Sequence, residues 1–241
     1  MCSALIDPPP ASGHFTNALV KAYSQRSLGL MKYLMEGGNA DANLQVNNGW
    51  GSYGAGLANA IQAGDLDIIK YLVTEAHADL NLELRFVPLS TALSMAIVFH
   101  SKDIVEFLVE GNANINLQFT LKSSSFGSAL DCAIGWSGSG ILAYLASHKT
   151  TDANIKHLQG PYANPLSRAI CQGCTDDVQI LLLAGASADF KWNNGSLLRV
   201  SKSNSKPSMP WSDDMTVPDG RRKAVVDILR KADPIQWMVK L

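Results

Sequence analysis

Two cysteines separated by two residues, Cys171 and Cys174, are the clearest candidates for chemistry in the sequence. A tetrahedral zinc site needs two more ligands at matching spacing, and thioredoxin-type redox chemistry needs a βαβ setting. The sequence around this pair offers neither. We therefore expect two small, reduced, buried residues at an interhelix turn, and we assign no metal to the chain.

Catalytic motifs are absent from the rest of the sequence as well. It contains no glycine-rich phosphate loop, no H-E-x-x-H and no G-x-S-x-G pattern. The five histidines stand singly, and His77 and His100 fall at turn positions, which favours structural roles. The sequence thus predicts no catalytic residue and no cofactor, and it favours a protein that is not an enzyme.

The composition narrows the classes of partner. With 20 Lys+Arg against 21 Asp+Glu in 241 residues, the net charge of −1 argues against nucleic acid or an anionic membrane as a partner. Hydrophobic residues make up 46%, enough for a sizeable core, yet no apolar run approaches the roughly 20 residues of a membrane span. The N-terminal residues lack the features of a signal peptide, and the four cysteines are typical of reduced thiols. We expect a cytoplasmic protein, with the nucleus as the alternative.

The elements that must position any site follow from a repeat. Five leucines spaced 38, 36, 37 and 36 residues apart mark its start: Leu19, Leu57, Leu93, Leu130 and Leu166. A second leucine follows each of them by fifteen residues: Leu34, Leu72, Leu108, Leu145 and Leu181. An alanine lies three residues after each first leucine: Ala22, Ala60, Ala96, Ala133 and Ala169. This spacing indicates repeated structural units.

Each repeat is predicted to form two short antiparallel helices. The first helix, of about nine residues, follows a residue that can cap backbone N–H groups, such as Thr91, Ser128 or Asn164, and Pro165 suits a first helical turn. Leucine and alanine at i and i+3 give this helix an apolar face. Glycine- or asparagine-rich segments follow the second helix, where a left-handed residue closes the helix end.

These features resemble the ankyrin repeat family. The resemblance is carried by helix starts such as residues 164–167 (N-P-L-S), second helices such as 68–72 (I-I-K-Y-L) and exits such as 78–81 (A-D-L-N), and it covers residues 16–193. It implies an all-α solenoid of stacked helix–turn–helix pairs with long hairpin fingers. The period exceeds the family's 33 residues, and no repeat has the family's histidine after its first leucine. The surplus residues fall in the fingers and are expected to deepen the groove beside the first helices.

The whole chain, residues 1–241, is predicted to be a single ankyrin repeat domain. Residues 1–15 form a lead-in, and residues 196–241 form a modified capping repeat. The five repeats are placed at approximately 16–53, 54–89, 90–126, 127–163 and 164–195. Residues 201–219, rich in Ser, Pro and Asp, form an inserted loop that either lacks order or folds back as a lid.

The resemblance also implies where a partner or ligand binds, because ankyrin proteins use their fingers and the exposed side of their first helices. Carried onto this sequence, the first helices and the turns after them contribute Lys21, Gln25, Asn59, Gln62, Met95, Phe99, Trp136, Arg168 and Gln172. The fingers contribute Trp50, Tyr53, Phe86, Phe119, Tyr162 and Trp192, and the inserted loop contributes Trp211. Exposed aromatic and arginine side chains are frequent anchors of binding surfaces.

Three functions remain open at this point. The family implies a protein–protein interaction module whose partner lies in the concave groove along Gln62, Phe99, Trp136 and Gln172. The alternative is a pocket for a small apolar molecule, or a pocket-based enzyme, with residues 201–219 as a lid and Lys21, Asn59 and Arg168 as the orienting polar groups. A third hypothesis is a scaffold within a larger regulatory protein, or a chain that pairs with itself.

Overall fold

The computed structural model describes most of the repeat region and short parts of the ends. The described residues are 18, 21–23, 25–37, 40–45, 56–84, 91–118, 127–135, 140–157, 162, 164–187, 191–192, 195–196, 224–225, 227–229 and 231. They belong to two compact units, Met1–Asn114 and Ile115–Leu241, which are treated separately below.

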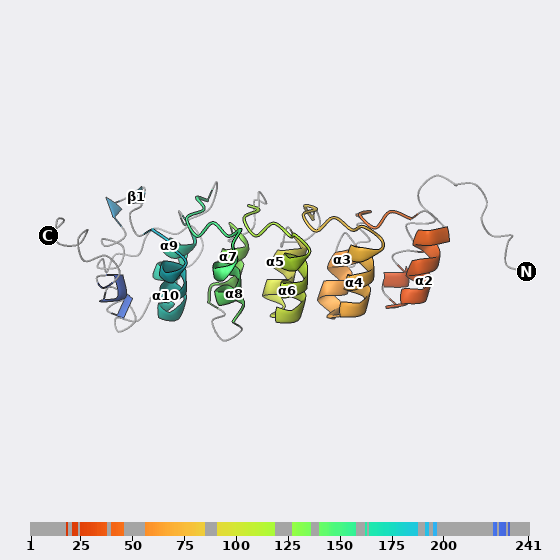
Figure 1. Cartoon of the computed structure of the whole chain (residues 1–241), viewed down its shortest axis with the longest axis horizontal. Helices are drawn as coiled ribbons and strands as arrows, with labels where there is room; N and C mark the ends of the chain where they lie inside the picture. The colour runs from red at the N-terminus through yellow and green to blue at the C-terminus, as the bar shows by residue number, and fades with distance from the viewer. Residues whose placement is uncertain are drawn as a thin grey trace, which may run out of the picture. The chain divides into compact units, whose positions relative to one another are not determined.

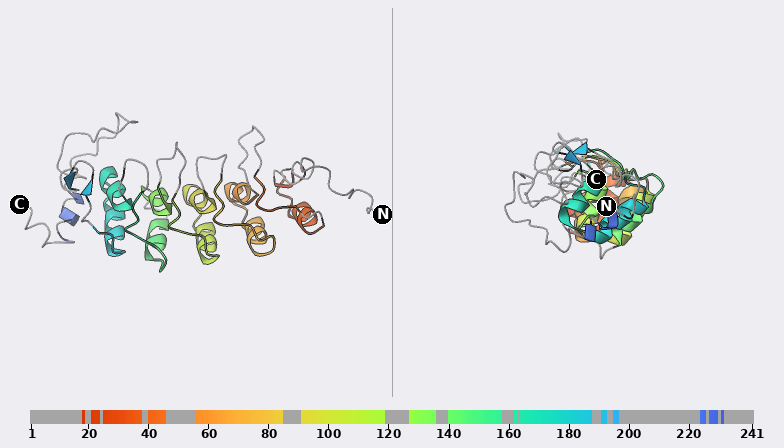
Figure 2. Two further views of the ribbon diagram at one scale, coloured as in Figure 1. Left: turned by 90° about the horizontal axis from the view of Figure 1, so that it is seen from above. Right: turned by 90° about the vertical axis from the view of Figure 1, so that its left-hand side faces the viewer.

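The first unit consists of paired helices (Figure 1). Its elements are α2 (Leu28–Lys32), which continues as the π-helical turn η1 (Tyr33–Gly37), α3 (Gly56–Ala63), α4 (Leu66–Thr74), α5 (Ala92–Val98) and α6 (Lys102–Glu110). Residues 18 and 21–23, from the predicted first helix of the first repeat, are also helical. Helix α3 packs against α4, α5 packs against α6, and α3 and α5 lie side by side (Figure 2).

The second unit repeats this arrangement. Its helices are α7 (Ala129–Ala133), α8 (Ile141–Ser147), α9 (Pro165–Gln172) and α10 (Thr175–Leu183). The predicted all-α class, built from helix–turn–helix pairs, is therefore confirmed. One short hairpin accompanies the helices: β1 (Lys191–Trp192) pairs antiparallel with β2 (Gly195–Ser196). Ser196, the first residue of the predicted capping repeat, pairs with Lys191 in this hairpin.

The leucines and alanines of the repeat form the core. Among the described first leucines the exposed fraction is 4% or less, and Leu72, Leu108, Leu145 and Leu181 are fully buried. The repeat alanines, from Ala22 to Ala169, are also at most 4% exposed. Because an alanine at this position presents only a methyl group, the two helices of a repeat approach closely.

The predicted caps start the first helices. The Thr91 side chain accepts the N–H of Ser94 at 3.1 Å, and the Ser94 hydroxyl in turn accepts the N–H of Thr91 at 3.1 Å. Asn164 and Ser167 form the same reciprocal pair before α9, where Pro165 occupies the first turn. Each such pair satisfies two backbone donors that a helix start leaves without partners.

A left-handed residue ends most of these helices. The turn between the paired helices has positive φ at Arg26, Gly64, His100 and Gly173. In the last of these turns, the N–H of Gly173 bonds to the carbonyl of Ile170 at 3.1 Å and the N–H of Cys174 to that of Ala169 at 3.0 Å. His77, Asn112 and Gly185 have the same conformation after the second helices. Glycine avoids the steric penalty that histidine meets at such a position.

Asparagine side chains connect successive repeats. In the first unit, Asn43 Oδ1 accepts the N–H of Asp79 at 2.7 Å and Asn81 Oδ1 accepts the N–H of Asn114 at 2.7 Å. In the second unit, Asn116 and Asn154 accept the N–H groups of Asp152 and Ser187 at 2.8 and 2.6 Å. We call these four residues the asparagine ladder. Each bond spans one repeat and so fixes the spacing of neighbouring repeats within a unit.

Candidate functional site

In the first unit, the predicted site residues lie mainly at the ends of the first helices. Lys21, Gln25, Gln62 and Phe99 are exposed, and Asn59 is half-buried. Met95 was expected on the exposed side of its helix, and that placement is wrong because it has no exposed surface. Helix α5 is enclosed by its neighbours α3 and α6, so every residue of it except Val98 is buried.

In the second unit, Arg168 occupies the repeat position of Met95 and is also buried, with 6% of its surface exposed. Its expected outward orientation is therefore wrong. The guanidinium carbon lies 5.6 Å from the centre of the Tyr162 ring, a cation–π contact. Tyr162 thus covers Arg168, and the half-buried phenol forms the surface in its place.

Gln172 completes a small cluster with these two residues. Its side chain hydrogen-bonds to the phenol of Tyr162, and it belongs to the same helix as Arg168, one turn further on. Burial raises the pKa of Tyr162, while the guanidinium of Arg168 and the bond from Gln172 act in the opposite direction. We call Tyr162, Arg168 and Gln172 the Tyr162 cluster. The structure brings these three predicted site residues together.

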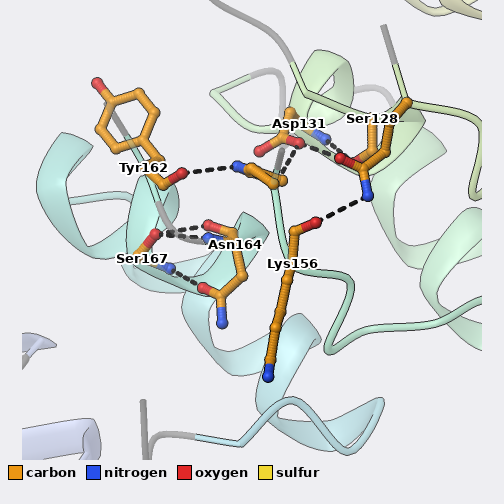
Figure 3. Close-up of polar contacts among 8 residues, drawn as sticks. Ser128, Asp131, Lys156, Tyr162, Asn164 and Ser167 are labelled. Atoms are coloured by element: carbon orange, nitrogen blue, oxygen red, sulfur yellow. Dashed lines mark hydrogen bonds and ion pairs between the residues drawn. The ribbon is translucent and has the colours of Figure 1, made fainter. Parts of the chain in front are cut away.

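A buried network adjoins the backbone of Tyr162 (Figure 3). Asp131 Oδ2 lies 2.7 Å from His157 Nε2 and accepts the hydroxyl of Ser128 at 2.7 Å. On the other side of the imidazole, Nδ1 lies 3.0 Å from the carbonyl oxygen of Tyr162. The side chains of His157 and Asp131 are 3% and 0% exposed. In Figure 3 the phenol ring of Tyr162 points away from Asp131.

One contact of His157 fixes a proton on its imidazole. A carbonyl oxygen only accepts hydrogen bonds, so Nδ1 must carry a hydrogen toward Tyr162. At its other nitrogen, Nε2, the imidazole lies 2.7 Å from the carboxyl oxygen Oδ2 of Asp131. His157 therefore ties Asp131 to the backbone of Tyr162.

Sequence reasoning treated His157 as one of several scattered histidines. The signal that it missed is at Asp131. At the same position after the helix cap, the neighbouring first helices have Ser94 and Ser167, whose hydroxyls accept the N–H groups of the capping residues. A carboxylate there has a second oxygen and a charge that need partners, and a histidine 26 residues further on supplies one.

The thiols of Cys132 and Cys171 are poorly suited to nucleophilic chemistry. Burial raises the pKa of the Cys171 thiol to about 12, and it also raises the pKa of the wholly buried Cys132 thiol. Both thiols are therefore protonated near neutral pH, which suppresses nucleophilic chemistry. No disulfide joins the three described cysteines, and Cys171 and Cys174 are half-buried rather than buried. Within the described ranges, no group of three or more His, Cys, Asp or Glu side chains gathers as a metal site.

Several predicted residues are not part of the described structure. Outside it lie the lead-in, the 201–219 loop and six site residues: Trp50, Tyr53, Phe86, Phe119, Trp136 and Trp211. Trp192 lies in β1. Of the polar trio proposed to orient a small molecule, Lys21 and Asn59 belong to the first unit and Arg168 to the second, where Tyr162 covers it.

Among the described helices, none has the length and hydropathy to cross a membrane.

Comparison with known proteins agrees with the helix pairs and the caps. Two overlapping segments, residues 19–119 and 57–157, match the family model described as ankyrin repeats (3 copies) and together cover more than half of the chain. The chain belongs to the ankyrin repeat family. No curated protein matches the sequence.

A solved ankyrin structure has a similar fold. It is the crystal structure of the ankyrin repeat domain of Bcl-3, described as a unique member of the IkappaB protein family. The TM-score is 0.67 at 19% identity, with 89% of this chain and 85% of that chain covered. At this identity the likeness concerns the fold alone. Ankyrin repeats are generally protein–protein interaction modules, and protein binding is the function class that family membership supports.

Proposed function

We propose that this ankyrin repeat chain binds a protein partner, without catalysis, along a groove formed by the ends of its first helices and its fingers. The contacts that we propose are Gln62 and Phe99 in the first unit and Gln172 in the second, together with Trp136, which lies outside the described residues. The observation that carries the proposal is the Tyr162 cluster, in which an aromatic ring is held by Arg168 beneath it and by Gln172 at its hydroxyl. Tyrosine is among the residues most enriched at binding hot spots.

Preorganisation is the physical reason that this cluster suits binding. A flexible side chain loses roughly 0.5–1.5 kcal/mol of rotamer entropy when a partner immobilises it. The ring of Tyr162 is already restrained by its contacts with Arg168 and Gln172, so less of this entropy is lost on binding. Arg168, being buried, supports the ring from below, and Tyr162 and Gln172 provide the contacts with the partner.

The first unit has a candidate contact surface of its own. Phe99, which ends α5, is 39% exposed, although every residue before it in that helix except Val98 is buried. The exposed amides of Gln25 and Gln62 occupy the corresponding helix ends of the two preceding repeats. An exposed aromatic side chain beside polar groups is the usual composition of an interface centre and its rim.

Site-specific photo-crosslinking in cells tests the proposal. A benzoylphenylalanine is introduced at Phe99 or Gln172, and the matched controls place it at Lys70 on α4 or Ala143 on α8, which are exposed positions on second helices. We expect positions 99 and 172 to capture the same polypeptide, and Tyr162→Ala to reduce capture from position 172. Equal capture from positions 70 and 143, or capture from those positions alone, would contradict the proposal.

A further inference from the structure

The backbone of Tyr162 is held by a side chain from the same repeat, five residues earlier. His157 donates from Nδ1 to the carbonyl oxygen of Tyr162 at 3.0 Å, and Tyr162 is the first described residue after His157. The imidazole that makes this bond is almost completely buried, so its orientation is set by the protein and not by solvent.

Two further contacts hold the imidazole in place. Asp131 Oδ2 lies 2.7 Å from Nε2, and the hydroxyl of Ser128 bonds to the same carboxylate oxygen. Gly127 packs against the ring so closely that a Cβ there would lie 2.8 Å from Cδ2 of His157. The ring is thereby fixed at both nitrogens and on one carbon edge.

We propose that His157 is the positioning residue of the Tyr162 cluster, and that Asp131 and Ser128 serve to hold its imidazole. The inference rests on the proposed protein-binding role of Tyr162. By fixing the carbonyl of residue 162, His157 sets the direction in which the phenol leaves the backbone and so places the ring over Arg168. A bound partner then meets a ring that is already oriented.

A comparison with the neighbouring repeats separates this role from helix capping. Thr91 with Ser94, and Asn164 with Ser167, form complete caps without any ionisable residue. Before α7, Ser128 accepts the N–H of Asp131 at 3.4 Å, a longer bond than its counterparts at 3.1 and 2.8 Å. Asp131 is therefore a poor replacement for serine as a cap residue, and what it adds is the contact with His157.

Two substitutions at residue 157 test its contacts with Tyr162 and with Asp131 one at a time. In His157→Asn, the amide nitrogen is placed near the former Nδ1 and keeps a donor for the carbonyl of Tyr162. In His157→Gln, the amide nitrogen is placed near the former Nε2 and keeps a donor for Asp131 alone. If His157 positions Tyr162, the Asn variant preserves the environment of the ring and the Gln variant loses it.

The readout is ¹⁹F NMR of the full chain labelled with 3-fluorotyrosine, with the Tyr162 resonance assigned by its loss in Tyr162→Phe. We expect this resonance to stay near its native position in His157→Asn and to move toward its urea-unfolded position in His157→Gln. His148→Ala is the matched control, because it removes another imidazole of the same unit, one whose centre lies 6.4 Å from that of the Tyr144 ring in a tilted arrangement. It should move the Tyr144 resonance and leave that of Tyr162 unchanged. A Tyr162 resonance that is native in His157→Gln would overturn the inference.

A second measurement needs no variant. Long-range ¹H–¹⁵N spectra of the native protein report the protonation of each imidazole nitrogen, and we expect His157 Nδ1 to carry a hydrogen. A bare Nδ1 would overturn the inference, because it could not donate to the Tyr162 carbonyl. The crosslinking assay at position 172 separates the two proposals. If capture persists in a His157→Gln protein whose Tyr162 resonance has moved, positioning by His157 stands and the binding role of Tyr162 fails.

Discussion

The close contact between Gly127 and His157 makes Gly127→Ala a sharp test of the buried network. An alanine Cβ would lie 2.8 Å from Cδ2, 2.9 Å from Cγ and 3.1 Å from Nε2 of the imidazole. Gly127 has no positive φ, so an alanine adopts this backbone without strain and only the contact with the ring opposes it.

The expected cost follows from how firmly the ring is held. Carbon atoms pack best at about 3.5–4.0 Å, so the ring or the backbone must move by several tenths of an ångström or more. The ring can withdraw only by lengthening its 2.7 Å contact with Asp131 or its 3.0 Å bond to Tyr162. Overpacking of this kind costs about 1–3 kcal/mol, and we expect Gly127→Ala to lower the free energy of unfolding by that amount.

Urea unfolding followed by circular dichroism measures this change, and a double-mutant cycle identifies its cause. In a His157→Ala background the added methyl group has space, so Gly127→Ala should cost little there and the coupling should equal most of the single-variant effect. Gly29→Ala is the matched control, because a Cβ at Gly29 in α2 meets nothing within 4 Å. It should be neutral or stabilising by up to about 1 kcal/mol. The reasoning is wrong if Gly127→Ala costs the same in both backgrounds.

Three further predictions concern other parts of the structure. The variant Asn81→Ala removes one member of the asparagine ladder and leaves the N–H of Asn114 without its 2.7 Å acceptor. It should lower the free energy of unfolding, measured by urea titration, by about 0.5–1.5 kcal/mol. An unchanged free energy would show that solvent replaces the side chain. Burial raises the pKa of Asp177 above its ordinary value of 3.8, so the native state keeps this proton to higher pH than the unfolded chain does. The stability that this proton provides is full below the unfolded value and is lost as pH rises through the raised native value. Asp177→Asn keeps an acceptor for the N–H of Gly135. Its free energy of unfolding should therefore rise relative to that of the native protein between about pH 4 and pH 7. A difference that does not change with pH would contradict the raised pKa of Asp177. Burial raises the pKa of Cys171 to about 12. Iodoacetamide at about pH 8 should therefore alkylate this thiol far more slowly in the native protein than in urea, which peptide mass spectrometry measures. Equal rates of alkylation would refute the burial of the thiol.

The local parts of the fold were predictable because the signals that produce them are local. A capping residue and the backbone N–H that it accepts are three residues apart, as in Thr91 and Asn164, so both caps are visible in the sequence. The repeat spacing likewise identified the leucines and alanines of the core, because each of them faces the same neighbour in every repeat.

Parts of the candidate site were not predictable in the same way. The repeat spacing shows that Met95 and Arg168 occupy equivalent positions in their repeats, but it does not show which residues cover each of them. Met95 is enclosed within the packed helices, and Arg168 lies under Tyr162. The sequence predicts that asparagines of the exits end the second helices, and the structure shows that such asparagines also accept backbone N–H groups from the next repeat.

The repeats, the helix pairs with their caps and the apolar core are all readable from the residue types, since each depends on short, regular spacing. Which side chains near the first helices reach the surface, and which histidine contacts a buried carboxyl group, depends on how the repeats pack. His157 and Asp131 are 26 residues apart, and they meet because the repeat folds back on itself. A carboxylate and an imidazole have no preferred separation along a chain, and it is burial that makes their contact necessary.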